Sequence, residues 1–300
     1  MTMGKWAGIF GVFLLIAGCG GEKTSPEYMA EIDQWHAERT ERLRSDTGWL
    51  TLVGLHPLAE GANSLGASAD ADVTLAAGAP YWLGTLAVTS EQIMFSAHPD
   101  AEVEVLESPT EGRLSSCTLA TDKEGPPTRL ATGSMVFYVI DRDGKLFLRV
   151  KDRKSEVLQS FQGIERFPVD VHWRLTAHLE PGPATINVPN VVGHRTASPS
   201  PGVLVFTIDK QEFRLTPTGA PGERMSLVFG DATNGKTTYA GGRFLTVDPP
   251  AADGTVILDF NRTYNPPCVF TPFATCPLPA AGNTLPVAVT AGEMMWGNQH

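Results

Sequence analysis

The stretch from Asp259 to Pro279 constrains the fold of this chain more than any other. It holds five prolines and two cysteines within one short irregular segment. Proline fixes its own φ angle and donates no backbone hydrogen bond, so regular structure is broken repeatedly here. Asp, Asn, Arg and Tyr side chains lie between the prolines and can bond the loop backbone. We expect a rigid loop that holds these polar groups in fixed positions.

Short β segments separated by turn residues fill the chain after Gly48. The 30 glycines and 23 prolines are spread along its length, a pattern typical of many turns and short strands. Asp-Gly at 143–144 is a hairpin signal, and Asn-Gly at 234–235 predicts a hairpin joining 225–229 to 237–239. The predicted fold is mainly β: an antiparallel barrel or sandwich of many short strands with one N-terminal α-helix.

The first eighteen residues resemble a bacterial lipoprotein signal peptide. Lys5 precedes an apolar run from Trp6 to Ala17, which is too short to span a bilayer. The run ends in Leu-Ile-Ala-Gly before Cys19, like a lipobox whose cysteine is acylated, although an uncleaved anchor or an ordinary signal peptide is the alternative. Gly20 follows without an aspartate, which by the same resemblance favours the outer membrane. We predict a lipoprotein that faces the periplasm and binds the membrane through lipid on Cys19.

The rest of the chain then divides simply. Residues 19–26 form a tether, and Ser25-Pro26 predicts the start of the helix. Residues 27–300 form one β-rich domain. The segment 181–201 carries five prolines and is a possible boundary within it.

Charge and motifs exclude several classes of function. The formal net charge is −10, which argues against a nucleic-acid partner. The sequence contains no G-x-S-x-G, H-E-x-x-H, G-x-G-x-x-G or Walker motif. No cofactor is therefore predicted, and no familiar hydrolytic mechanism is indicated.

The cysteines and histidines indicate structure more than chemistry. With Cys19 lipidated, Cys268 and Cys276 form the natural disulfide pair in an oxidising compartment, with two packed thiols as the alternative, and Cys117 is expected in a buried strand. The spacing of Cys268 and Cys276 does not match a zinc motif, and no metal site is predicted. The best available set of candidate metal ligands would join one histidine to two carboxylates: His172 or His194 with Asp259 and Glu293.

Four segments in the second half of the chain resemble the DUF1684 family of uncharacterised bacterial and archaeal proteins. They are Thr238-Tyr-Ala-Gly-Gly-Arg-Phe-Leu245, Asp259-Phe-Asn-Arg-Thr-Tyr-Asn-Pro-Pro-Cys268, Thr271-Pro-Phe-Ala-Thr-Cys-Pro-Leu-Pro279, and Asn283 with Ala291-Gly-Glu293. Trp49–Leu55 and the Gly61/Asn63/Gly66 turn resemble its N-terminal motif, so the resemblance covers most of the mature chain. His56-Pro57 stands where the family pattern has an aromatic pair. The resemblance implies no activity, because the family has none assigned.

Three functional hypotheses follow from the polar residues in these segments. The first is a β domain that binds a small polar or anionic ligand, or a component of the cell envelope, through Arg243, Asn261, Arg262, Tyr264 and Asn265. The second is a hydrolase that uses Asp259 or Glu293 as general base, with Arg262 stabilising charge. The third is a structural envelope lipoprotein whose polar residues only hold the loop together.

Overall fold

The computed structural model describes residues 23–75, 78–107, 113–142, 144–191 and 193–297. The predicted signal segment and Cys19 lie outside these ranges. Within them the protein is mainly β, with short and mostly antiparallel strands and one long N-terminal helix, which confirms the predicted fold class. Each sheet formed by the described strands is open, so the barrel form of that prediction is not adopted.

The elements follow in chain order. The helical elements are α1 (Pro26–Arg44), η1 (Trp49–Thr51), α2 (Glu156–Ser160), η2 (Val171–Trp173), η3 (Phe260–Arg262) and η4 (Pro267–Val269). The strands of the first half are β1 (Leu52–Pro57), β2 (Gly61–Gly66), β3 (Val73–Thr74), β4 (Gly84–Val88), β5 (Ile93–Ala97), β6 (Glu104–Val105), β7 (Ser116–Leu119), β8 (Leu130–Thr132), β9 (Met135–Arg142) and β10 (Lys145–Asp152). Those of the second half are β11 (Arg174–Glu180), β12 (Thr185–Pro189), β13 (Arg195–Pro199), β14 (Val203–Ile208), β15 (Gln211–Leu215), β16 (Met225–Phe229), β17 (Arg243–Val247) and β18 (Thr255–Asp259).

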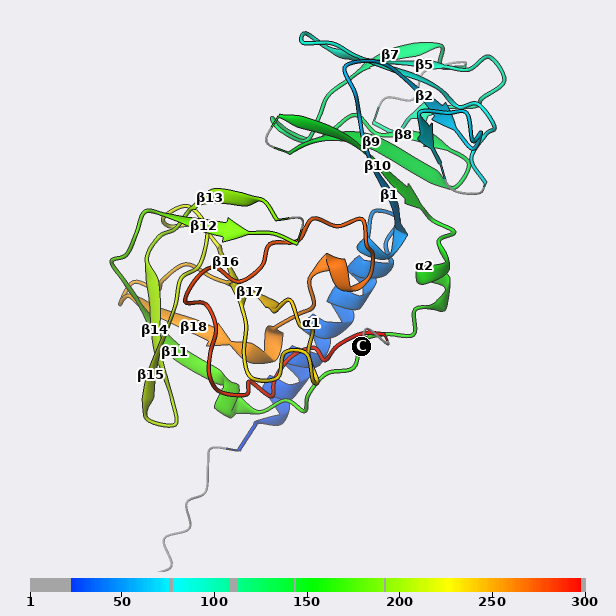
Figure 1. The fold of residues 1–300 in the computed structure, drawn as a ribbon. Helices are drawn as coiled ribbons and strands as arrows, with labels where there is room; N and C mark the ends of the chain where they lie inside the picture. Colours follow the sequence, from blue (N-terminus) through cyan, green and yellow to red (C-terminus); the bar gives the residue numbers. More distant parts are fainter. Residues whose placement is uncertain (1–22, 76–77, 108–112, 143, 192, 298–300) are drawn as a thin grey trace, which may run out of the picture.

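Strands β1–β10 form a sandwich, the first unit (Figure 1). One sheet has the order β1-β10-β9-β8-β6 and the other β3-β2-β4-β5-β7. Their facing side chains share one core, in which the rings of Phe95 and Phe137 lie 5.7 Å apart. Because side chains alternate along a strand, Leu148 and Val150 face this core while Phe147 and Arg149 face away from it.

Strands β11–β18 and the loops after them form a second unit with its own core. Its main sheet has the order β15-β14-β11-β18, and β12-β13 and β16-β17 are separate hairpins. Phe206, Phe229 and Phe260 meet in its centre. The proline-rich segment 181–201 contains β12 and β13, so it belongs wholly to this unit, and α2 lies in the connection between the two units (Figure 1).

Helix α1 crosses from the tether to the first unit and lies against the second. Ser25 caps it by accepting a hydrogen bond from the Tyr28 amide, and Pro26 occupies the first turn, as the sequence predicts. In Figure 1 the helix runs beside the C-terminal part of the chain. Nowhere in the described ranges does a helix combine the length and apolar character needed to cross a membrane.

One predicted hairpin is wrong. Strand β16 pairs with β17 at residues 243–247, and not with residues 237–239 across the Asn-Gly turn. Residues 231–241 instead form a wide loop, because the Asn234 side chain is hydrogen-bonded to Asp231, Thr238 and Tyr239. These contacts hold Asp231 in place for the ion pair described next.

Candidate functional site

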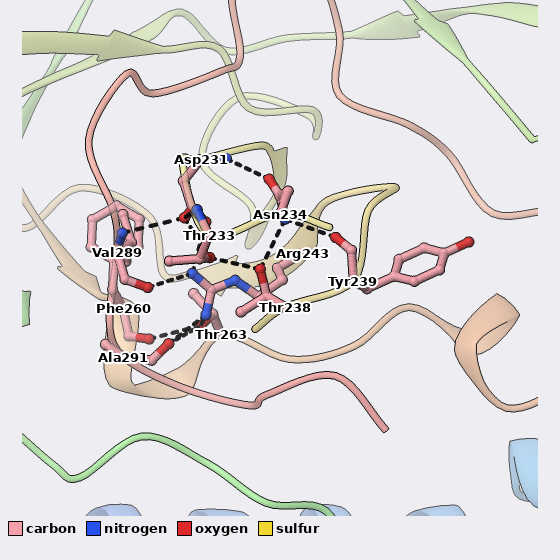
Figure 2. Close-up of polar contacts among 10 residues, drawn as sticks. All are labelled: Asp231, Thr233, Asn234, Thr238, Tyr239, Arg243, Phe260, Thr263, Val289 and Ala291. Atoms are coloured by element: carbon pink, nitrogen blue, oxygen red, sulfur yellow. Dashed lines mark hydrogen bonds and ion pairs between the residues drawn. The ribbon is translucent and has the colours of Figure 1, made fainter. Parts of the chain in front are cut away.

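The side chain of Arg243 is fully buried at the start of β17. It donates to the Asp231 carboxylate at 2.8 Å, to the Val289 carbonyl at 2.8 Å, to Thr263 Oγ1 at 3.2 Å and to the Ala291 carbonyl. Figure 2 shows the guanidinium enclosed by these groups. Burial lowers the pKa of Arg243, while Asp231 opposes that shift. Of the three guanidinium nitrogens of Arg243, only Nε makes no hydrogen bond.

Asp231 is the counter-charge that the sequence analysis missed. One carboxylate oxygen takes the Arg243 donor, and the other accepts from the amide and hydroxyl of Thr233. The Thr233 hydroxyl also meets that of Thr238 at 2.7 Å (Figure 2). An Asp-x-Thr pattern is common in local turns, so it does not indicate a buried ion pair.

Asp259 ends β18, and its carboxylate is 9% exposed. The Tyr28 hydroxyl of α1 donates to it at 2.7 Å, and the Asn261 amide donates at 3.1 Å. Arg262 Nε lies 3.5 Å and Arg174 Nε 4.0 Å from its second oxygen. Burial and the hydrogen bond to Asp259 raise the pKa of Tyr28. This carboxylate therefore ties the N-terminal helix to the second unit.

Glu293 makes a second tie to the same helix. Its side chain is fully buried, and Arg39 Nε of α1 donates to it at 2.5 Å. The Asn265 amide donates to its other oxygen at 2.7 Å. Arg39 also donates to the Asn265 carbonyl at 2.9 Å and stacks 4.4 Å above the ring of Tyr264.

The remaining candidates of the proline-rich loop (Asp259–Pro279) join the same network. Asn261 is buried and bonds the Tyr28 hydroxyl and both backbone groups of Asp170. Asn265 is buried and donates to the Met294 carbonyl at 2.7 Å. Arg262 pairs with Glu31 of α1, and Tyr264 is half-buried beneath Arg39. The structure thus brings Asp259 together with Asn261 and Arg262, and Glu293 together with Asn265, whereas Arg243 bonds other residues.

The two loop cysteines are in contact, and both thiols are free in the structure, so the expected disulfide is not formed. The Cys268 amide donates to Cys276 Sγ at 3.0 Å. A hydrogen bond from the Cys276 thiol and another from Tyr239 lower the pKa of Cys268, whereas the pKa of Cys276 is raised. Cys117, expected to be buried, is half-buried in β7.

A groove of about 640 Å³ lies between the two units, away from the polar network. Its first wall is the outer face of the β1-β10-β9 sheet, and its second is the β12-β13 hairpin with residues 275–277. Apolar side chains form much of the lining, with acidic and basic groups beside them: Leu55, Asp141, Lys145 and Phe147 on the first wall, and Val188, His194 and Pro277 on the second. None of the candidate residues of the proline-rich loop lines this groove.

No sequence pattern indicates the groove, because its two walls come from residues far apart in the chain.

The histidines His172 and His194 do not form a metal site with Asp259 and Glu293. Within the described part of the chain, no three His, Cys, Asp or Glu side chains gather so that they could hold a metal ion.

Comparison with known proteins adds a family. The model of the family described as "Protein of unknown function (DUF1684)" matches residues 159–294. These residues belong to the DUF1684 family. The DUF1684 match covers the second unit, including β17, the proline-rich loop and Glu293, and leaves the Trp49–Leu55 and Gly61–Gly66 segments outside it.

Other comparisons give no activity. A solution NMR structure of an uncharacterized protein from gene locus rrnAC0354 of Haloarcula marismortui is 29% identical over 45% of this chain and 78% of its own, with a TM-score of 0.38. No curated protein matches.

Proposed function

We propose that this DUF1684 protein is a lipid-anchored envelope protein that binds a small amphiphilic molecule in the groove between its two units. The observation that carries the proposal is the groove itself. Its volume of about 640 Å³ falls within the roughly 300–1,000 Å³ of small-molecule sites. An apolar floor of Leu55, Phe147 and Val188 with a few polar groups at its sides suits a ligand with an apolar body.

The buried polar network supports the groove as the ligand site, because its own donors are already engaged within the protein. Arg243, Asn261 and Asn265 direct their donors to Asp231, Asp170 and Met294. A ligand could reach these donors only by breaking hydrogen bonds that the fold needs. We therefore assign the network a structural role and place the ligand in the groove.

The same geometry disfavours hydrolysis by the proline-rich loop. Glu293 is fully buried and held by Arg39, so no substrate proton is within its reach. Asp259 is held by Tyr28 and Asn261 on one oxygen and faces two arginines with the other. Both oxygens of Asp259 are thus engaged by contacts within the protein, which leaves neither directed at a substrate.

The proposed anchor leaves the groove open to the periplasm. Helix α1 begins at Pro26, and the first unit, which supplies one wall of the groove, lies near its C-terminal end (Figure 1). The helix has 19 residues, which at 1.5 Å a residue makes it about 28 Å long. The groove would thus stand roughly one helix length from the lipid surface.

Binding can be tested with decanoate as the probe, at concentrations below its micelle point. The sample is the chain from residue 19 carrying Cys19→Ser, so that no acyl chain competes. We expect one decanoate to bind, and we expect Phe147→Asp and Val188→Asp each to weaken binding at least tenfold. Ile257→Asp is the matched control, because Ile257 is exposed and does not line the groove. Equal losses in all three variants, or no binding by the parent, would overturn the proposal.

The anchor has its own test. Cells expressing the full chain should hold the protein in the membrane fraction, with acyl groups on the peptide that begins at Cys19. Cys19→Ser should move the protein to the soluble envelope fraction. If the unmodified full chain is found in the soluble envelope fraction, the anchor proposal is refuted and the groove proposal stands.

A further inference from the structure

Arg149, in the middle of β10, is a buried cation without a carboxylate. Its exposed fraction is 8%, and its Nε has no hydrogen-bond partner. Among the described residues it makes no ion pair, and its guanidinium lies over the rings of Trp49 at 5.5 Å and Tyr138 at 5.9 Å. Both distances fall within the range of a cation–π interaction, which attracts the charge without using the N–H donors as hydrogen bonds.

Lys151 repeats the pattern two residues further along the same face of β10. It is 6% exposed, and its ammonium donates to the carbonyls of Thr47 and Gly48. An ammonium has three donors, so one remains beyond these two carbonyls. Burial and the nearby positive charges of Arg149 and Arg129 lower the pKa of Lys151 to about 8. Two cations therefore lie side by side, and the charge of Arg149 disfavours the charged form of Lys151.

The other buried cations of the chain show what is missing here. Arg243 is paired with Asp231, and Arg39 with Glu293. The carboxylate of Asp122 feels the charge of Arg149, but both its oxygens accept hydrogen bonds from Arg142, at 3.1 and 2.8 Å. A buried charge without a partner is unfavourable, so a site with two such cations is suited to an anion from outside the chain.

Neither Arg149 nor Lys151 lines the groove itself, but Arg149 lies next to two residues that do. Leu55 of β1 is the direct cross-strand partner of Arg149, and Phe147 precedes Arg149 by two residues on the same face of β10. Directly opposed side chains in a sheet start about 5 Å apart, and those two residues apart along a strand about 7 Å. Both Leu55 and Phe147 line the groove. Arg149 is thus the residue next to the apolar floor formed by Leu55 and Phe147.

We propose that Arg149 and Lys151 form the anion subsite of the groove, taking the carboxylate or phosphate head of a ligand whose apolar chain lies over Phe147 and Leu55. This inference rests on the proposed function, since it names the ligand class for the same groove. The planar fork of Arg149 can hold two oxygens of such a head, and Lys151 supplies a second positive charge. The Trp49 ring, 5.5 Å from the guanidinium carbon, attracts its charge without taking up its N–H donors.

The test compares three probes of one chain length: decanoate, decyl phosphate and decanol. The parent should bind both anions at least tenfold more tightly than the alcohol. Arg149→Met should abolish that preference and leave the affinity for decanol unchanged, and Lys151→Met should reduce it severalfold. Arg153→Met is the matched control, because Arg153 is exposed and pairs with Asp46. Decanoate and decyl phosphate in parallel also show which head the subsite prefers.

The stability of the unliganded variants separates an anion site from a structural role. Methionine at 149 removes an unpaired buried charge, so Arg149→Met should unfold at the same temperature as the parent or above it. If Arg149→Met unfolds at a lower temperature and keeps the anion preference, Arg149 is structural and the subsite is refuted. If the parent binds none of the three probes, the groove proposal itself fails. If the parent binds decanol as tightly as decanoate, the groove survives and the subsite does not.

Discussion

The guanidinium of Arg243 and the carboxylate of Asp231 lie 2.8 Å apart, and neither side chain is exposed to solvent. The pair joins the start of β17 to the loop after β16, and the Val289 and Ala291 carbonyls close around it. A full charge in such surroundings is tolerated only with its partner in place. The pair therefore locks these segments of the second unit together and is not a ligand site.

Breaking this pair should destabilise the protein strongly. Arg243→Met leaves Asp231 buried without its counter-charge, which costs about 3–5 kcal/mol of unfolding free energy. Urea unfolding followed by circular dichroism measures the loss. Arg224→Met is the control: its pair with Asp248 is exposed, so the change should stay within about 1 kcal/mol. Equal effects in the two variants would contradict the lock.

Removing the Tyr28 hydroxyl should loosen helix α1. Tyr28→Phe deletes the donor to Asp259 and an acceptor of Asn261, and a hydrogen bond to a charged group contributes about 1.5–3 kcal/mol. We expect lower stability by urea unfolding and faster proteolysis within α1. Tyr81→Phe, at an exposed position, should change neither measurement. A Tyr28→Phe protein as stable and as protease-resistant as its parent would show that the tie contributes nothing.

Stability should fall as the pH drops from 7.5 to 5.5. Burial lowers the pKa of His36 and of His56 below the usual value near 6.5. In this window the unfolded histidines take up protons that the folded ones exclude, which favours unfolding as the pH falls. Around His36, Glu293 acts in the opposite direction, while Arg166 and Arg39 act in the same direction as burial.

The variants His36→Gln and His56→Gln isolate this effect. Melting temperatures at several pH values should show a shallower decline in each variant, and the shallowest in the double variant. His172→Gln, at an exposed position, should decline as the parent does. A double variant with the slope of the parent would exclude the two histidines as its source.

Cys268 should react with iodoacetamide at lower pH than Cys117. The Cys276 thiol and the Tyr239 hydroxyl lower the pKa of Cys268, while burial raises that of Cys117. Peptide mapping across pH 6–10 gives the midpoint for each cysteine. Tyr239→Phe should shift the Cys268 midpoint upward and leave that of Cys117 in place. Unreactive Cys268 linked to Cys276 in the purified protein would show that the disulfide forms after all.

The sequence predicted the fold class and the helix because both depend on local patterns. Ser25-Pro26 marks the helix start whatever it packs against, and turn residues mark short strands anywhere in the chain. The Asn-Gly hairpin was wrong because Asn234 serves Asp231, Thr238 and Tyr239, and such tertiary demands override a turn signal.

The site was only partly predictable for the same reason. Asp259, Arg262 and Glu293 stand out in the sequence, but their partners Tyr28, Glu31 and Arg39 lie more than 200 residues away on α1. Without these partners, a structural network and a ligand site look alike. The groove was not predictable from the sequence, because Phe147 and Val188 become neighbours only when the two units fold.

Photolabelling tests most directly whether the groove, and not the segment 259–265 of the proline-rich loop, is the binding site. A decanoate with a diazirine on its chain is bound to the chain from residue 19 carrying Cys19→Ser, irradiated, and mapped by mass spectrometry. We predict labels on β10, near Phe147, and on β12-β13, near Val188, with loss of both upon addition of excess decanoate. Competed labels on residues 259–265, with none on the groove, would contradict the account.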